Sequence, residues 1–457
     1  MSRNIVLHKC TATFKLVHAL KGLIASARAD KTYPKWSDNF LKYCEGTADA
    51  TFNRLKSWSD INEKDTLLFS ILSQRLSIII HGWELLHSFI KPILDADNLK
   101  VPYPLVQFLN EHVGKLEKVK EAKFVIEISP DLNYFQHQHT DLARAMFFLK
   151  TVIEGPPIGP KLGFLALPCS QSKGLFMNCL LYHEAGHFIA EEIGFMSPTE
   201  RAVLRDELRN DFKKQHNATI PLKQYLPWAV TTTEELMEEL FSDIVAVKLI
   251  GLAYTLSYME LLRLVRNDLS QESMRFSIDH PADSLRFREQ LKVLRKDGWA
   301  KYAKNLTQWK ELNNIANIRE NQYSVPSDYR SDPEISKVWR ILIQCLCKRS
   351  RIKSIHKKVD SYLYGRDNPC DLYGKYREQI EKCFSHGIVP CSKESGNIPH
   401  PLAVINGAFL FWISAMEKLY DTVPSRSEKN IEDRAFLENR IEMWCLKAIE
   451  DWLITTK

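Results

Sequence analysis

Leu180-Leu-Tyr-His-Glu-Ala-Gly-His-Phe-Ile-Ala-Glu-Glu-Ile-Gly-Phe195 is the most informative stretch of the sequence. Its apolar residues recur at helical spacing, and Gly194 stands where helix C-termini prefer glycine, so the stretch predicts a helix. His183 and His187 are four residues apart, which places both imidazoles on one helix face. Because this spacing lets two nitrogens converge on one metal ion, we expect a Zn²⁺ site here. Glu184 lies one position round the helix, where it can reach a zinc-bound water.

The third ligand of a catalytic zinc site is expected on another element, because such sites use three protein ligands and leave one position open. Residues 231–246 read Thr-Thr-Thr-Glu-Glu-Leu-Met-Glu-Glu-Leu-Phe-Ser-Asp-Ile-Val-Ala. They predict a helix that begins at Thr231 or Thr232, with a glutamate three residues on to close a capping box.

Two carboxylates of this second helix, Glu239 and Asp243, are one turn apart on a face that continues into apolar residues. An unpaired buried carboxylate is costly, and ligation of zinc by Glu239 removes that cost. Asp243 can accept the second ring N–H of a ligating histidine and so fix its tautomer. Glu235 and Glu238 are the alternatives for the third ligand, and Glu238 ranks lower because no carboxylate follows it at four residues.

Three blocks in this order resemble a known class of enzymes. His183-Glu-x-x-His187 followed by Glu239-x-x-x-Asp243 is similar to the gluzincin zinc metallopeptidases. Ser277-Ile-Asp-His-Pro-Ala-Asp-Ser-Leu-Arg286 resembles the His-Pro-x-x-x-x-Arg element of the CAAX prenyl proteases and their bacterial heat-shock relatives. The resemblance covers about 170–290. The chain departs from that family in having no expected transmembrane helices, so a soluble relative is expected.

The resemblance implies roles for individual residues. Glu184 would be the general base, and Asp243 would support a ligand histidine. His280 and Arg286 would contact the substrate or the transition state, or serve as a structural tie. The implied fold is mostly α, with a small α+β zincin-like catalytic core between helical N- and C-terminal flanks.

The domain organisation follows from a change of pattern along the chain. Residues 1–122 read as a helical N-terminal region. Strand signals at 123–129 and 163–167 precede the two motif helices, which predicts a metallopeptidase core over 123–300. Residues 301–457 read as a helical C-terminal region. Within it, residues 348–358 hold six Lys or Arg, which we interpret as a solvated helix face.

Composition excludes several classes of protein. The chain has 457 residues with 62 basic and 56 acidic side chains, and this net charge of +6 supports no nucleic-acid partner. Ten cysteines without framework spacing are typical of reduced thiols in a cytoplasmic protein. The longest run without a charged residue or a histidine, 401–416, has sixteen residues, fewer than the ~20 that a membrane span needs.

The function expected from these features is that of a soluble zinc endopeptidase acting on a protein or peptide substrate. Glu184 would activate a zinc-bound water, as a general base does. The helical flanks are expected to gate or deliver substrate and to bind a regulatory protein partner. The alternative is a regulatory or interaction protein whose zinc site is structural or vestigial.

Overall fold

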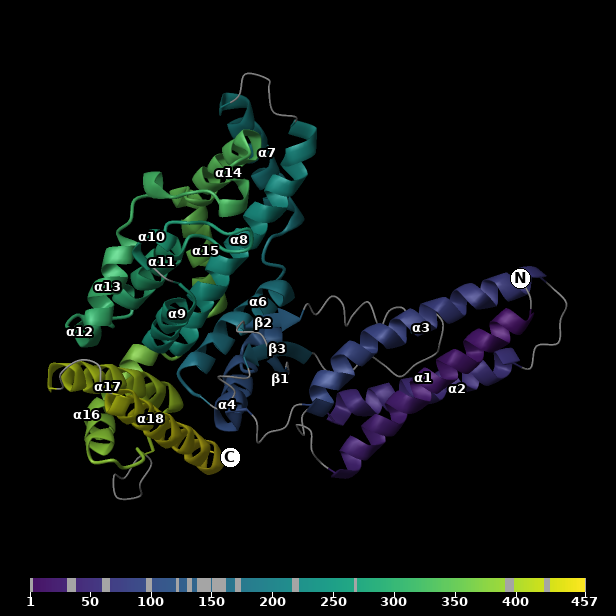
Figure 1. The fold of residues 1–457 in the computed structure, drawn as a ribbon, viewed down its shortest axis with the longest axis horizontal. Helices are drawn as coiled ribbons and strands as arrows, with labels where there is room; N and C mark the ends of the chain where they lie inside the picture. The colour runs from purple at the N-terminus through teal and green to yellow at the C-terminus, as the bar shows by residue number, and fades with distance from the viewer. Residues whose placement is uncertain are drawn as a thin grey trace. The chain divides into compact units, whose positions relative to one another are not determined.

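The chain folds into two compact units, Met1–Lys173 and Gly174–Lys457, in a computed structural model (Figure 1). Each unit is described by itself. The structure describes residues 3–30, 38–59, 66–95, 101–120, 123–129, 134–137, 149, 162–168, 174–215, 222–266, 269–390, 398–422 and 428–456.

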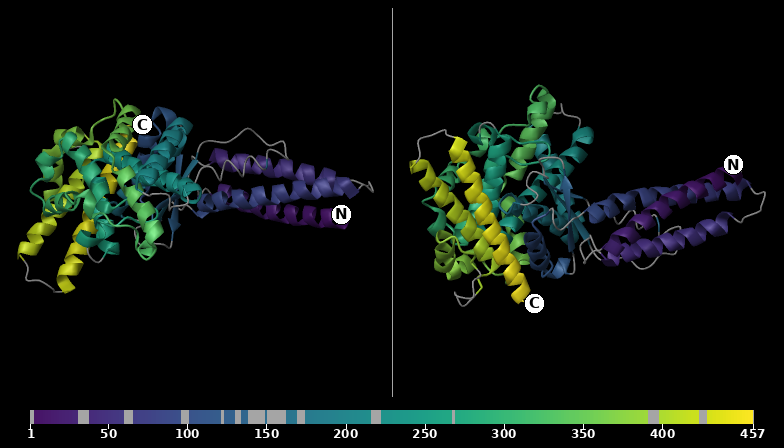
Figure 2. Two further views of the ribbon diagram at one scale, coloured as in Figure 1. Left: turned by 90° about the horizontal axis from the view of Figure 1, so that it is seen from above. Right: turned by 60° about the horizontal axis from the view of Figure 1, so that its bottom comes forward.

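The first unit contains three long helices that pack side by side, as Figures 1 and 2 show: α1 (Arg3–Asp30), α2 (Asp38–Ser59) and α3 (Thr66–Asp95). Their apolar side chains form one core, in which Val17, Ile79 and Trp83 are fully buried. The indole Nε1 of Trp83 donates a hydrogen bond of 3.2 Å to Thr51 Oγ1, so the polar end of this large side chain is also satisfied.

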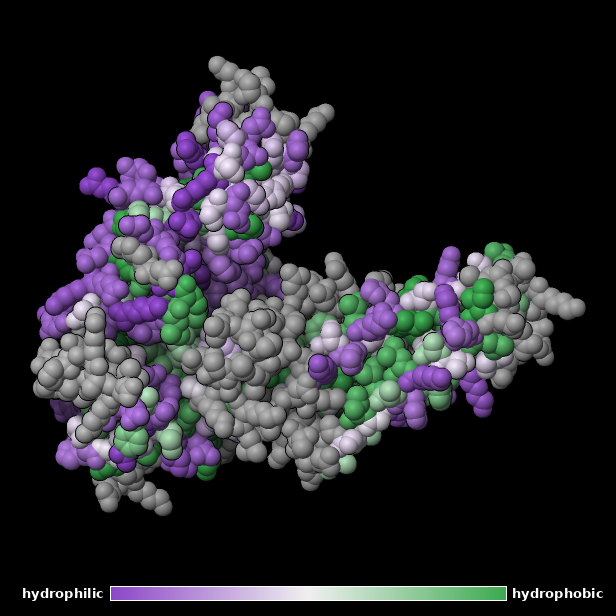
Figure 3. Space-filling view, viewed as in Figure 1, coloured by the Kyte–Doolittle hydropathy of each residue, from purple (hydrophilic) through white to green (hydrophobic). Residues whose placement is uncertain are grey.

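Not all apolar side chains of these helices are buried. Figure 3 shows apolar residues on the visible surface of the first unit. Phe14 and Leu23 of α1 and Leu67 of α3 are exposed, Leu67 by 68%. This unit therefore presents apolar surface outside its own core.

A small sheet completes the first unit. It contains β1 (Lys123–Ser129), β2 (Phe135–His137) and β3 (Leu162–Pro168) in the order β1-β3-β2. Strand β3 pairs in parallel with β1 and antiparallel with β2. The central strand is buried throughout its middle, as its unbroken apolar run Gly163-Phe-Leu-Ala-Leu predicts.

Helix α4 (Tyr103–Val113) is tied to the edge of this sheet by Asn110. Phe124 N donates a hydrogen bond of 2.6 Å to Asn110 Oδ1, and Asn110 Nδ2 donates one of 3.2 Å to Phe124 O. The buried amide thus pairs with backbone groups that an edge strand would otherwise leave without partners. A short 3₁₀ turn, η2 (Glu117–Val119), follows α4.

The second unit is helical. After the 3₁₀ turn η4 (Met177–Leu180) come α6 (Leu181–Ile193), α7 (Pro198–Gln215), α8 (Leu222–Ile250), α9 (Leu252–Val265), α10 (Leu269–Glu272), α11 (Asp283–Lys296), α12 (Ala300–Ala303), α13 (Thr307–Ala316), η5 (Glu320–Gln322), η6 (Ser327–Tyr329), α14 (Pro333–Leu346), α15 (Arg349–Tyr362), α16 (Pro369–Ser385), α17 (Pro401–Thr422) and α18 (Glu428–Thr455).

Helix α8 is the centre of the second unit, and it contacts α6, α7, α11, α14 and α15. Its second half, 236–250, is almost entirely buried, because apolar residues occupy all sides of the helix there. Carboxylates on this buried half of α8 must therefore find partners inside the protein.

Helices α17 and α18, drawn in yellow, pack side by side, and α17 contacts α9 (Figure 2).

The expected fold class, mostly α with a small sheet, is confirmed, as are strands at 123–129 and 163–167. The expected helix start at Thr231 or Thr232 is wrong. Helix α8 begins at Leu222, and the Thr233 hydroxyl donates a hydrogen bond of 2.7 Å to Ala229 O inside the helix instead of capping its end.

Contacts within the structure cross both of the domain boundaries expected from the sequence, at 122 and at 300. Helix α4 and β1, on either side of 122, are joined by Asn110, and α14 and α15 pack against α8 across 300. The two compact units are divided at 173, so the sheet and the motif helices lie in different units. Among the described residues, no helix combines the length and the apolar character needed to cross a membrane.

Candidate metal centre

The candidate site is built where α6 and α8 cross closely. Gly186 of α6 lies against Ser242 of α8, so closely that a Cβ on Gly186 would lie 2.8 Å from Ser242 Cα. Only glycine fits at such a backbone approach. The crossing brings the histidine face of α6 against the carboxylate face of α8.

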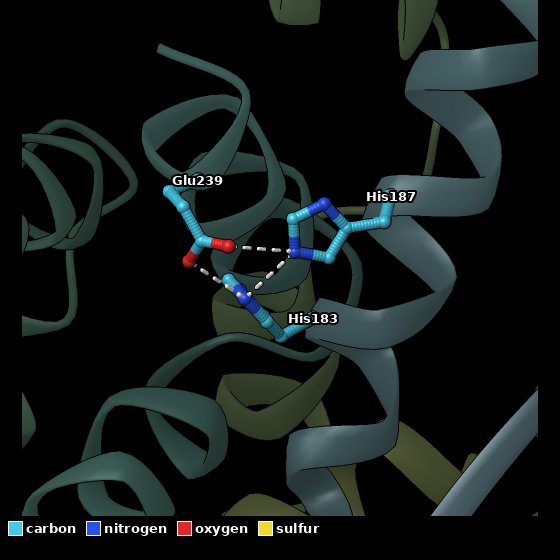
Figure 4. Close-up of side chains that lie close together, drawn as sticks. All are labelled: His183, His187 and Glu239. Atoms are coloured by element: carbon cyan, nitrogen blue, oxygen red, sulfur yellow. Dashed lines mark hydrogen bonds and ion pairs between the residues drawn. The ribbon is translucent and has the colours of Figure 1, made fainter. Parts of the chain in front are cut away.

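Three side chains converge at this crossing, as Figure 4 shows: His183 and His187 from α6 and Glu239 from α8. The Nε2 atoms of the two histidines are 3.2 Å apart. His187 Nε2 lies 3.2 Å from Glu239 Oε1, and His183 Nε2 lies 3.3 Å from Glu239 Oε2. The side chains are 9%, 18% and 10% exposed, so the group is largely withdrawn from water.

These separations match the edges of a zinc coordination shell. Bonds of about 2.0–2.1 Å in a tetrahedron place ligand atoms about 3.3–3.4 Å apart. In addition, Glu239 Oε2 is buried and faces nitrogen atoms, with His280 Nδ1 at 3.0 Å and Arg286 Nη2 at 3.5 Å. Two imidazole nitrogens and a carboxylate are a donor set that suits Zn²⁺. The residues therefore fit the metal that the sequence predicts.

In both histidines the outer ring nitrogen, Nδ1, faces away from the candidate metal position and contacts a carboxylate. His183 Nδ1 lies 3.1 Å from Asp243 Oδ1, and His187 Nδ1 lies 3.0 Å from Glu238 Oε1. Such carboxylates orient an imidazole and fix the proton on the outer nitrogen, which leaves Nε2 free to bind a metal. The arrangement at Asp243 agrees with the sequence-based expectation.

Asp243 is itself held by two further residues. Arg286 of α11 donates two hydrogen bonds of 2.7 Å to its carboxylate, and the Tyr254 hydroxyl of α9 donates another to Oδ1. Tyr254 Oη also lies 3.2 Å from His183 Nδ1. The Asp243 carboxylate is fully buried, and these donors satisfy it.

The electrostatics of the group favour positive charge at its centre. Burial would lower the pKa of His187, but the charge of Glu239 and the contact with Glu238 outweigh burial and hold that pKa well above its ordinary value. Burial would raise the pKa of Asp243, but Arg286 and His183 hold it below its ordinary value. A field that favours protons on imidazoles also favours a cation between them.

Glu184 and His280 lie at the edges of this group. Glu184 is 7% exposed on α6, and its charge contributes to the raised pKa of His187. His280 lies in a turn closed by a hydrogen bond of 2.8 Å from its backbone N–H to Ser277 Oγ. Its Nδ1 lies 3.0 Å from Glu239 Oε2, and its side chain is 49% exposed, so it borders both the ligand carboxylate and solvent.

The structure thus brings together the residues selected from the sequence: His183, Glu184, His187, Glu239, Asp243, His280 and Arg286. Glu239, not Glu238, faces both Nε2 atoms. Glu235 is exposed on α8 and lies outside the group. Arg286 is 5% exposed and bound to Asp243, the geometry of a structural tie.

Sequence reasoning missed three contributions. From the sequence, Glu238 is only a competing ligand, whereas in the structure it contacts the outer nitrogen of His187. Tyr254 stands at no characteristic spacing from the motif residues, and it lies on a different helix, α9, which begins after Gly251. Gly186 lies inside the histidine motif, in the middle of a predicted helix. Because glycine destabilises a helix interior, its presence there could have indicated close packing against another helix.

Comparisons with known proteins identify no relative. No family model matches the chain, and searches of curated proteins and of solved structures returned no match.

Proposed function

We propose that this protein is a zinc-dependent endopeptidase of the gluzincin type that hydrolyses peptide bonds of a protein substrate. One observation carries the proposal: the two histidine Nε2 atoms lie 3.2 Å apart, each lies 3.2–3.3 Å from an oxygen of the Glu239 carboxylate, and the outer ring nitrogen of each histidine contacts a further carboxylate. His183, His187 and Glu239 would hold the metal. A Zn²⁺ ion supplies Lewis acidity and acidifies water, which is the chemistry that peptide hydrolysis needs.

The side chains around the ligands would carry the proton transfers. Glu184, next to His183 on α6, would accept a proton from the attacking water and deliver it to the leaving amine. His280 is half exposed beside Glu239 and would donate a hydrogen bond to the oxyanion that develops on the peptide carbonyl. Arg286 would act as a positioning residue through Asp243, because its guanidinium is committed to that carboxylate.

A catalytic site is favoured over a structural one by the ligand count. Among the described residues, no fourth His, Cys, Asp or Glu joins His183, His187 and Glu239. A structural zinc site closes its coordination shell with a fourth protein ligand, and a catalytic site leaves that position open. The half-exposed His280 also indicates that this side of the group is accessible to a substrate.

Location and partners follow from other features. The eight cysteines that the structure describes as free thiols are all buried, which supports a reducing compartment and a cytoplasmic location. We further propose that the first unit binds a protein partner that regulates the enzyme or delivers substrate. The exposed Phe14, Leu23 and Leu67 support this assignment, because apolar surface of this kind is covered in protein complexes.

The test compares the full-length protein with its Glu184→Gln variant. Both are purified without chelators, their metal content is measured by mass spectrometry, and both are incubated with cell lysate whose new protein N-termini are then sequenced. We expect about one zinc per chain in both proteins, because Glu184 is not a ligand. We expect new N-termini only with the wild type.

Glu192→Gln is the matched control, because Glu192 lies on the same helix near its C-terminus. This variant should bind zinc and generate the same N-termini as the wild type. Equal sets of new N-termini with wild type and Glu184→Gln, or none with the zinc-loaded wild type, would refute the peptidase assignment. Zinc binding alone would then favour the regulatory alternative.

A further inference from the structure

A cavity of about 790 Å³ lies in the second unit, away from the candidate metal ligands. Residues of α8, α11 and α15 line it, together with Glu320 and Cys347. Its volume is typical of sites that hold small molecules. None of the metal-site residues described above lines this cavity.

The walls of the cavity are strongly basic. Seven lysine or arginine side chains line it against three carboxylates, a formal surplus of four positive charges. Lys248, Lys292 and Lys296 approach from α8 and α11, and Arg349, Lys353 and Lys357 approach from α15. The chain as a whole has a net charge of only +6, so much of that excess is concentrated here.

Helix α15 divides its basic residues between two faces. Lys348 and Arg351 turn toward α7, where Lys348 Nζ lies 2.6 Å from Asp211 and Arg351 Nη2 lies 2.5 Å from Glu207. The other face carries Arg349, Lys353 and Lys357 at intervals of four residues, one above another along the cavity wall. The expected solvated face at 348–358 is therefore two surfaces with different partners.

The carboxylates of the cavity are already paired with other cations. Glu289 accepts hydrogen bonds from Lys292 at 2.7 Å, and Asp360 pairs with Lys296 at 3.0 Å. Within the described parts of the chain, Arg349, Lys353 and Lys357 have no ion pair and no hydrogen bond from their side chains. Three parallel cations on one helix face repel one another, and this repulsion is relieved when an anion binds between them.

We propose that this cavity binds a compact polyphosphate, a small scaffold that carries several phosphate groups, through Arg349, Lys353 and Lys357. Arg and Lys are the side chains that recognise phosphate, and three of them at one-turn intervals match several phosphates better than a single anion. Among the residues that the structure describes, none lining the cavity is Phe, Tyr or Trp, so the wall offers no surface for base stacking, which argues against a nucleic acid.

The experiment measures binding to the full-length protein by isothermal titration calorimetry, with inositol hexakisphosphate as the probe. Vesicles that contain phosphatidylinositol bisphosphate and a single-stranded DNA oligonucleotide are titrated in parallel. We expect saturable binding of one inositol hexakisphosphate per chain, which weakens as salt is added. Binding of the free polyphosphate alone assigns a soluble ligand, and binding of both polyphosphate and vesicles assigns a lipid headgroup.

The test variant is Arg349→Gln/Lys353→Gln/Lys357→Gln. All three side chains are exposed, so the fold should be unchanged, which circular dichroism checks. We expect Kd for inositol hexakisphosphate to rise about tenfold or more. Arg205→Gln/Lys213→Gln/Lys214→Gln is the control, since it removes the same charge from exposed positions of α7, outside the cavity.

Three outcomes would overturn the proposal. The first is no saturable binding of inositol hexakisphosphate by the wild type. The second is equal binding by the test and control variants, which would show attraction by net charge only. The third is DNA binding that is tighter than polyphosphate binding and is lost in the test variant, which would assign the surface to a nucleic acid.

Discussion

Arg286 forms a bidentate ion pair with Asp243: the guanidinium Nε and Nη2 each donate a hydrogen bond of 2.7 Å to a different carboxylate oxygen. The two side chains are 5% and 0% exposed. Because Asp243 also lies 3.1 Å from His183 Nδ1, this pair links α11 to a candidate metal ligand on α6. One buried ion pair thus connects α11 and α8 to the His183 imidazole.

Replacing Arg286 by alanine should therefore destabilise the protein. Loss of one partner leaves Asp243 as an uncompensated buried charge, and we expect the free energy of unfolding to fall by about 3–5 kcal/mol. Arg286→Lys should recover only part of this, since an ammonium group cannot form both hydrogen bonds. Urea denaturation measures both changes. Arg295→Ala, an exposed position of the same helix, should change stability by less than about 0.5 kcal/mol, and an equal loss there would contradict the argument.

Glu238 and Glu239 are sequence neighbours with different expected effects on zinc binding. Glu239 faces both Nε2 atoms, so Glu239→Gln should abolish stoichiometric zinc. Glu238 contacts only the outer nitrogen of His187, so Glu238→Gln should lower zinc affinity by about 10–100-fold and leave the 1:1 stoichiometry intact. Competition with a fluorescent chelator measures both affinities.

The ligand assignment has two controls. Glu235→Gln should leave zinc affinity unchanged, because Glu235 is exposed and outside the group. His183→Ala/His187→Ala should lose the metal. Stoichiometric zinc in that double variant, or loss of zinc from Glu238→Gln but not from Glu239→Gln, would mean that another set of residues binds the metal.

A pH-dependent contribution to stability is expected from Glu289. Burial alone would raise the pKa of this carboxyl, but hydrogen bonds from His356 and Lys292 outweigh burial and lower the pKa below its ordinary value of 4.5. A carboxylate with a lowered pKa in the folded state stabilises the protein above the pKa of the unfolded state. That stabilisation is lost as pH falls through the folded-state pKa.

Glu289→Gln should accordingly reduce the free energy of unfolding by about 1–3 kcal/mol at neutral pH. The difference from the wild type should shrink as pH falls below about 4.5, because the wild-type carboxyl then becomes protonated. Denaturation curves at a series of pH values test this. Glu320→Gln, at a carboxylate that is 51% exposed, should show little difference at any pH. A Glu289→Gln difference that stays constant down to acidic pH would refute this account.

The sequence predicts the candidate ligands because their geometry is local. His183 and His187 share a face through helix periodicity alone, and Glu239 and Asp243 do so in the same way on α8. The roles of Glu238 and Tyr254 are not local. They depend on how far α8 and α9 are rotated about their axes when they pack on α6, and no residue spacing records that rotation.

The extent of the elements was harder to predict than their type. The run of threonines, with Glu234 or Glu235 three residues on, predicts a helix start at Thr231 or Thr232, yet α8 continues unbroken from Leu222. In the additional turns Trp228 packs against Trp339 of α14, and such tertiary packing overrides local capping preferences. For the same reason the sheet and the motif helices, which follow one another in sequence, belong to different units.

Gly186 sets the distance between the two ligand-bearing helices, and its substitution tests that relationship directly. A Cβ at this position would lie 2.8 Å from Ser242 Cα and 2.9 Å from Ser242 Cβ, so in Gly186→Ala α6 must move away from α8. Overpacking of this kind costs about 1–3 kcal/mol of unfolding free energy. The movement also separates His187 from Glu239, which are 3.2 Å apart across the same crossing.

We therefore expect Gly186→Ala to lose both stability and zinc affinity, measured by urea denaturation and by chelator competition. Gly22→Ala is the control, because Gly22 lies within α1 and a Cβ there would meet nothing within 4 Å. Alanine at that position should stabilise the helix by about 0.5–1 kcal/mol. If Gly186→Ala were instead as stable as the wild type, with zinc affinity unchanged, α6 and α8 would not be in close contact at Gly186, and the convergence of the three ligands would need another explanation.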